Sequence, residues 1–79
     1  MENVTRPLYE IAKEIKKDWT KINYAAKPYL DAMSDLNSIT DNYGYDNGKS
    51  IVLYFLSNAG SWRGENAKRI KAELKLIIK

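Results

Sequence analysis

The sequence predicts an all-α fold: a small bundle of three to four helices with one long loop, in a single domain over residues 1–79. Apolar residues recur at spacings of three and four along most of the chain, as in helices buried along one side. One run, residues 51–56, has the composition of a strand, and a strand without a partner leaves its backbone groups unsatisfied. Hydrophobic residues make up 44% of the chain, which is ordinary for a globular domain.

The first helix is expected over about residues 7–19. Thr5 followed by Pro7 favours a helix start there, because proline fits the first turn. The apolar stripe that follows is Leu8, Ile11, Ala12, Ile15, Trp19 and Ile22.

A second helix is expected to begin at or just before Pro28 and to end before Asn37. Tyr29, Leu30, Met33 and Leu36 would form its apolar face.

Residues 37–48 hold three Asn, two Asp and two Gly, which predicts a loop. Ile39 and Tyr43 are expected to attach this loop to the core.

Residues 50–56 suit either a buried strand or a helix, and the helix is favoured because the chain offers no second strand. As a helix, the segment would take Asp46 as its N-cap and Gly60 as its C-terminal glycine. Its buried face would then be Ile51, Val52, Phe55, Leu56 and Ala59.

A last helix is expected after Ser61, which would cap it. Its apolar stripe is Ala67, Ile70, Leu74 and Ile77. Trp62 would precede the helix and fold back onto its first turn.

Charge is unevenly distributed along the chain. Residues 1–40 contain equal numbers of bases and acids, and residues 41–79 carry the net charge of +3.

In outline, the last two predicted helices resemble a helix-turn-helix. In that interpretation the last helix would bind nucleic acid, with Asn66 or Arg63 at a base edge. The commoner explanation of several basic residues along one helix is that they form its solvated face. The phosphate contacts would come from Arg63, Lys68, Arg69, Lys71 and Lys75.

The composition argues against an enzyme. The chain has no cysteine and no histidine, so the commonest general base and the commonest metal ligands are missing. Gly48-Lys49-Ser50 resembles the end of a phosphate-binding loop, but Tyr43 stands where that motif needs its first glycine. Asp41 and Asp46 lack the spacing of a calcium loop. We therefore expect no catalytic residue, no metal and no cofactor.

The aromatic residues favour a protein-binding surface. The tyrosines at positions 24, 29, 43, 45 and 54 cannot all be core in so small a domain, and Tyr and Trp are enriched at binding hot spots. Trp62 is also explained as a core residue between the last two helices. The four aspartates among the residues named next would in part imitate phosphates. The predicted protein-partner residues are Asp31, Asp35, Asp41, Tyr43, Tyr45, Asp46, Trp62 and Arg63.

Several segments together resemble a family of short proteins encoded by phages, plasmids and conjugative elements of Gram-positive bacteria. The resemblance covers about residues 8–75. It carries over no catalytic or binding residue. The segments are Leu8–Trp19, Pro28–Met33, Tyr43–Asp46, Ser50–Leu56 and Trp62–Glu65.

The resemblance implies an accessory binding protein that blocks or redirects a host protein complex, including a CRISPR effector. Its expected place is the cytoplasm of the bacterial host, since the N-terminal residues lack the pattern of a signal peptide. We thus expect an anti-CRISPR-like inhibitor. The alternatives are a small DNA- or RNA-binding accessory protein and a homo-oligomer with an assembly role.

Overall fold

Four helices make up the fold in the computed structural model, which describes residues 6–44 and 46–78. The fold is therefore the all-α bundle that the sequence predicts. Two strands of two residues each, β1 (Asn42–Tyr43) and β2 (Asp46–Asn47), form a short antiparallel hairpin before α3. The helices are α1 (Leu8–Asp18), α2 (Lys27–Met33), α3 (Gly48–Ser57) and α4 (Glu65–Ile77).

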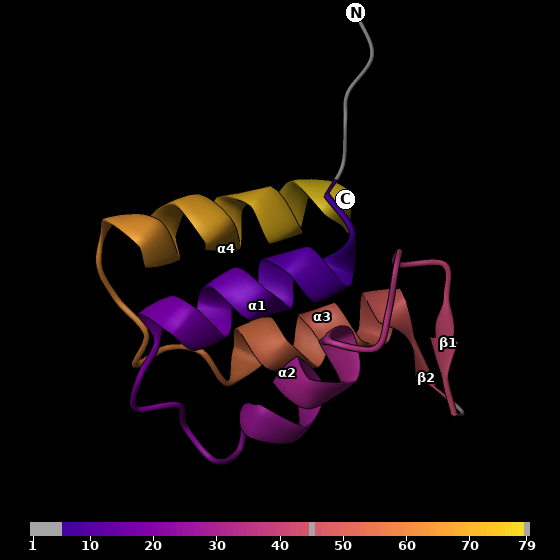
Figure 1. Cartoon of the computed structure of the whole chain (residues 1–79), viewed down its shortest axis with the longest axis horizontal. Coiled ribbons are helices and arrows are strands. Elements are labelled where there is room, and N and C mark those ends of the chain that lie inside the picture. Colours follow the sequence, from indigo (N-terminus) through magenta and orange to yellow (C-terminus); the bar gives the residue numbers. More distant parts are fainter. Residues whose placement is uncertain (1–5, 45, 79) are drawn as a thin grey trace, which may run out of the picture.

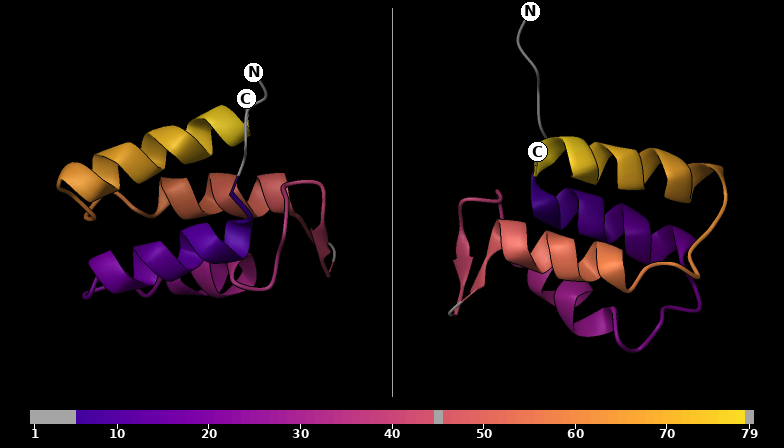
Figure 2. Two further views of the ribbon diagram at one scale, coloured as in Figure 1. Left: turned by 45° about the horizontal axis from the view of Figure 1, so that its top comes forward. Right: turned by 180° about the vertical axis from the view of Figure 1, so that it is seen from behind.

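The helices pack so that the start of α1 and the end of α4 meet at one end of the molecule (Figure 1). In both views of Figure 2, α4 runs antiparallel to α1 and α3. The short α2 lies beneath α1 and α3 in Figure 1, and the hairpin stands beside the first turn of α3. None of the helices among the described residues is long and apolar enough to cross a membrane.

The core follows the predicted apolar stripes. Helix α1 buries Leu8, Ile11, Ala12 and Ile15 along one side, as expected from their spacing. The segment at 50–56 is a helix, and it buries Ile51, Val52 and Phe55. Helix α4 buries Ala67, Ile70 and Leu74. The partly buried Ile39, from the loop before β1, packs against the same core.

An aromatic cluster fixes the end of α1 against α3 and the loop after it. The rings of Trp19 and Trp62 are stacked with centroids 5.7 Å apart, and Phe55 meets each of them edge to face. All three side chains are buried. Aromatic pairs in these geometries stabilise a core beyond the area they bury.

Three of the predicted helix caps are wrong. The N-cap of α3 is Asn47 and not Asp46, because the helix begins at Gly48 and the side-chain oxygen of Asn47 accepts the Ser50 N–H. Helix α3 ends at Ser57 with Asn58 as its C-cap, so Gly60 is not the C-terminal glycine of the helix.

Helix α4 begins after Gly64, with φ of +116°, and not after Ser61. The physical reason is Trp62. Burial of its side chain draws residues 58–64 into an irregular connection, so the helix cannot start before that segment ends. The predicted role of Thr5 lies outside the described residues.

Candidate binding surfaces

Trp62 is a core residue and not a surface contact. Its side chain is 2% exposed, and its indole N–H donates to the Asp18 carboxylate at 2.8 Å. The prediction that Trp62 meets a protein partner is therefore corrected in favour of the core explanation. Its neighbour Arg63 is exposed.

The four predicted acidic contacts have different roles. Asp41 is a structural residue, because its carboxylate accepts the backbone N–H groups of Asn37 and Ser38. Asp31 forms an exposed ion pair with Lys16 at 3.1 Å. Asp35 and Asp46 are exposed. The acids therefore do not act as one phosphate-like set, since one is engaged by the backbone and another by a lysine.

Two predicted contacts cannot be placed. Tyr45 and the side chain of Tyr43 lie outside the part of the chain that the structure describes.

Two exposed apolar side chains of α3, Leu53 and Tyr54, lie where that helix meets the partly buried Tyr29 of α2. The rings of Tyr29 and Tyr54 lie 5.4 Å apart at a tilt of 42°, so the two helices join there at the surface. Tyr54 remains 48% exposed, and its neighbour Leu53 is 46% exposed. Neither Leu53 nor Tyr54 is among the protein-partner residues predicted from the sequence.

Tyr24 lies beside this surface and is 87% exposed. The preceding residue, Asn23, donates its side-chain N–H to the backbone oxygen of Asn58 at 3.2 Å. Asn58 in turn donates to the backbone oxygen of Tyr54 at 2.9 Å. These bonds hold the backbone next to Tyr24 against the end of α3. We call Tyr24, Tyr29, Leu53 and Tyr54 the tyrosine face.

The charges of α4 divide between two sides of the helix. On the side toward α1, Arg6 bonds to both Glu14 and Glu73, and Arg69 bonds to Glu14. This network of two bases and two acids joins the segment before α1, α1 and α4. Arg69, a predicted nucleic-acid contact, is therefore engaged within the protein.

Glu14 makes stability depend on pH. The hydrogen bond from Arg69, followed by that from Arg6, lowers its pKa below the ordinary value of about 4.3. A carboxylate with a lowered folded-state pKa contributes stability above its unfolded pKa, and the contribution is lost as pH falls through the folded pKa. We expect Glu14→Gln to reduce the free energy of unfolding by about 1 kcal/mol near pH 7.

Urea unfolding of the protein and of Glu14→Gln near pH 7 and near pH 3 tests this expectation. The difference between the two proteins should shrink as the pH falls toward the lowered pKa of Glu14. An equal difference at both values would contradict the role assigned to its charge.

Another side of α4 carries a row of lysines, with Glu65 near its start. Lys68 and Lys75 are exposed, and no carboxylate in residues 6–44 and 46–78 lies within ion-pair distance of them. Lys71 is partly buried and donates to the backbone oxygen of Trp62 at 2.7 Å. Burial, and then the nearby charges of Lys75 and Arg63, lower the pKa of Lys71. We call Arg63, Lys68, Lys71 and Lys75 the basic flank.

The helix-turn-helix interpretation is not supported. Seven residues, 58–64, connect α3 to α4, whereas that motif uses a turn of about three to four residues. The two helices run antiparallel in Figure 2 and do not cross at the wide angle of the motif. Asn66, expected at a base edge, donates instead to Asp18 at 3.0 Å.

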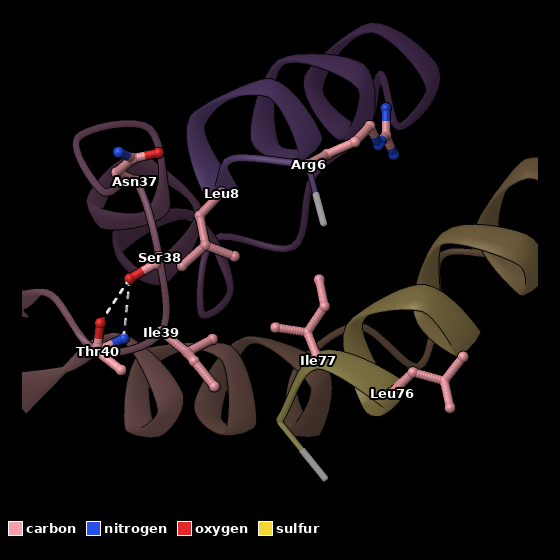
Figure 3. Close-up of a pocket in the computed structure, with 8 residues that line it drawn as sticks. All are labelled: Arg6, Leu8, Asn37, Ser38, Ile39, Thr40, Leu76 and Ile77. Atoms are coloured by element: carbon pink, nitrogen blue, oxygen red, sulfur yellow. Dashed lines mark hydrogen bonds between the residues drawn. The ribbon is translucent and has the colours of Figure 1, made fainter. Parts of the chain in front are cut away.

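A hollow of about 330 Å³ lies between the start of α1, the loop before β1 and the end of α4. Figure 3 shows Leu8, Ile39 and Ile77 pointing into it, while the guanidinium of Arg6 turns away. That guanidinium is bonded to Glu14 and Glu73, and the other lining residues carry no charge. Leu8, Ile39 and Ile77 offer apolar contact, and the hydroxyls of Ser38 and Thr40 are hydrogen-bonded to each other at 2.7 Å.

Comparisons of this chain with protein-family models, curated proteins and solved structures found no match.

Proposed function

We propose that this protein is a non-enzymatic binding protein that occupies a surface of a protein partner with its tyrosine face. The observation that carries the proposal is the contact between the partly buried Tyr29 of α2 and the exposed Tyr54 of α3, with the exposed Leu53 next to Tyr54 in the sequence. Tyrosine side chains bury a large area for the loss of few rotatable bonds, which makes them effective anchors at interfaces.

The tyrosine face is held on a rigid support. Met33 and Leu30 of α2 and Phe55 and Val52 of α3 are fully buried beneath it. A backbone held by these core residues need not be reordered when a partner binds, so more of the contact energy contributes to affinity.

The partner that we propose is a component of a host defence complex, with a CRISPR effector as the first class to test. The resemblance to short proteins of phages and conjugative elements supports this choice. An inhibitor of this kind needs a folded scaffold and a contact surface, and it needs no reaction centre.

The test is a DNA-cleavage assay with purified RNA-guided nucleases of Gram-positive bacteria, each loaded with its guide RNA. We expect the protein to inhibit one of them. The double variant Leu53→Ser/Tyr54→Ala should need at least about tenfold more protein for the same inhibition, since each lost anchor weakens binding by about 1 kcal/mol or more.

The matched control is Tyr9→Ala/Leu76→Ser, which removes a tyrosine and a leucine that are 48% and 70% exposed elsewhere. We expect this control to inhibit as the unchanged protein does. Equal loss in both double variants would contradict the assignment of the tyrosine face. Absence of inhibition across the nucleases would contradict the proposed partner.

A further inference from the structure

The basic flank is a region of uncompensated charge. The acids of α4 are Glu65 and Glu73. Glu73 is bonded to Arg6 on the α1 side of the helix. Glu65 lies in the first turn of α4, at the end of the flank nearest to Lys68. A single carboxylate there leaves most of the charge of four cations unbalanced.

The lysines of the flank form a row along the helix. Lys68, Lys71 and Lys75 are separated by three and four residues, so their side chains project from one side of α4. At a rise of about 1.5 Å per residue, the row extends about 10 Å along the axis. A nucleic-acid strand carries one phosphate for about every 3.4 Å of duplex axis. The row therefore matches the length of about three consecutive phosphates.

The centre of the row is fixed in place. The Lys71 ammonium donates to the Trp62 backbone oxygen and lies 5.7 Å from the centre of the Trp62 ring. Trp62 is itself anchored in the aromatic cluster. Lys71 thus holds a positive charge between two exposed lysines, and a bound anion would relieve the repulsion between these charges.

We propose that the basic flank binds the phosphate backbone of a nucleic acid, independently of the sequence of its bases. The large apolar side chains that are exposed in the described residues are Tyr9, Tyr24, Leu53, Tyr54 and Leu76. Of these, Leu76 alone lies on α4, directly after Lys75, so one apolar side chain at most adjoins the row. A protein partner draws its affinity mainly from apolar anchors, whereas a phosphate backbone is bound by regularly spaced cations alone. The observations therefore favour nucleic acid over an acidic protein.

This inference goes beyond the tyrosine face, because different residues carry it. A protein that uses both surfaces would suit a partner composed of protein and nucleic acid together. The tyrosine face would contact the protein and the basic flank would contact the exposed backbone of its DNA or RNA.

Fluorescence anisotropy with labelled single-stranded and duplex DNA of about 20 nucleotides tests the inference. One phosphate contact from each of the four cations of the basic flank predicts a slope of log affinity against log salt of about −3 to −4. Raising the salt from about 50 mM to about 200 mM should then weaken binding roughly 50- to 150-fold. Lys68→Glu/Lys75→Glu should weaken binding at least about tenfold at the lower salt and should reduce the slope to about half.

The control is Lys13→Glu/Lys17→Glu, which makes the same change in net charge at two exposed lysines of α1. We expect it to change affinity less than about threefold, since exposed charges farther apart than about 10 Å are largely screened. Circular dichroism checks that both variants remain folded.

Three results would overturn the inference. The first is the absence of binding to either DNA at the lower salt. The second is an equal loss of affinity in the α1 control, which would mean that net charge alone sets the binding. The third is competition by poly-glutamate as effective as competition by unlabelled DNA, which would indicate an acidic protein as the ligand. The tyrosine-face variant Leu53→Ser/Tyr54→Ala should bind DNA normally, so the two proposals can fail separately.

Discussion

Replacement of Trp62 by alanine is expected to lower the free energy of unfolding by about 3–5 kcal/mol. The indole ring is buried between Trp19 and Phe55, and its removal leaves a cavity at the junction of α1, α3 and α4. The variant also loses the hydrogen bond from the indole N–H to Asp18. A domain of 79 residues has a total stability of only about 4–12 kcal/mol. The loss is therefore large enough to unfold much of the protein.

Urea titration followed by circular dichroism measures this loss. Trp62→Phe keeps most of the buried ring and removes the N–H donor, so we expect a smaller loss of about 1–2 kcal/mol. Tyr24 is more exposed than Tyr9 or Tyr54, and Tyr24→Ala should change stability by less than about 0.5 kcal/mol. If Trp62→Ala were as stable as Tyr24→Ala, the core position of this ring would be wrong.

The helices were predictable because their signal is repeated. In α1 and α4 several apolar residues recur at helical spacing, so one residue that departs from the pattern does not hide the period. The caps were less predictable because each depends on one residue. Asp46 and Asn47 are both good N-caps by type, and the choice between them depends on where the loop contacts of Gly48 let the helix begin.

The candidate surfaces were partly predictable. Assigning Ile51, Val52 and Phe55 to the buried side of a helix already places Leu53 and Tyr54 away from it. The basic flank also follows from spacing, because Lys68, Lys71 and Lys75 avoid the apolar stripe of α4. Sequence could not show that Arg69 is bonded to Glu14, since the two residues are brought together only when α4 packs on α1. The burial of Trp62 depends in the same way on contacts between distant segments.

Gly48 is the position where one added methyl group is expected to disturb the fold most. A Cβ atom there would lie 2.7 Å from the Ser38 backbone oxygen and 2.8 Å from the Ile39 Cα atom. Both are backbone atoms, so the clash cannot be relieved by turning a flexible side chain. The loop before β1 is tied to α3 at this point, because the Gly48 and Lys49 N–H groups donate to the oxygens of Asp41 and Ile39. We expect Gly48→Ala to destabilise the protein by about 1–3 kcal/mol.

The expected loss stands out because helix propensity acts in the opposite direction. Gly48 begins α3, where alanine would ordinarily be favoured by about 0.5–1 kcal/mol. Gly60 provides the control, since its φ is not positive and no atom lies within 4 Å of an added Cβ. Gly60→Ala should therefore be neutral or stabilising by up to about 1 kcal/mol. Thermal unfolding of both variants measures the contrast. A Gly48→Ala protein as stable as Gly60→Ala would mean that the loop does not pack against α3, because only that contact gives the two glycines opposite responses to the same substitution.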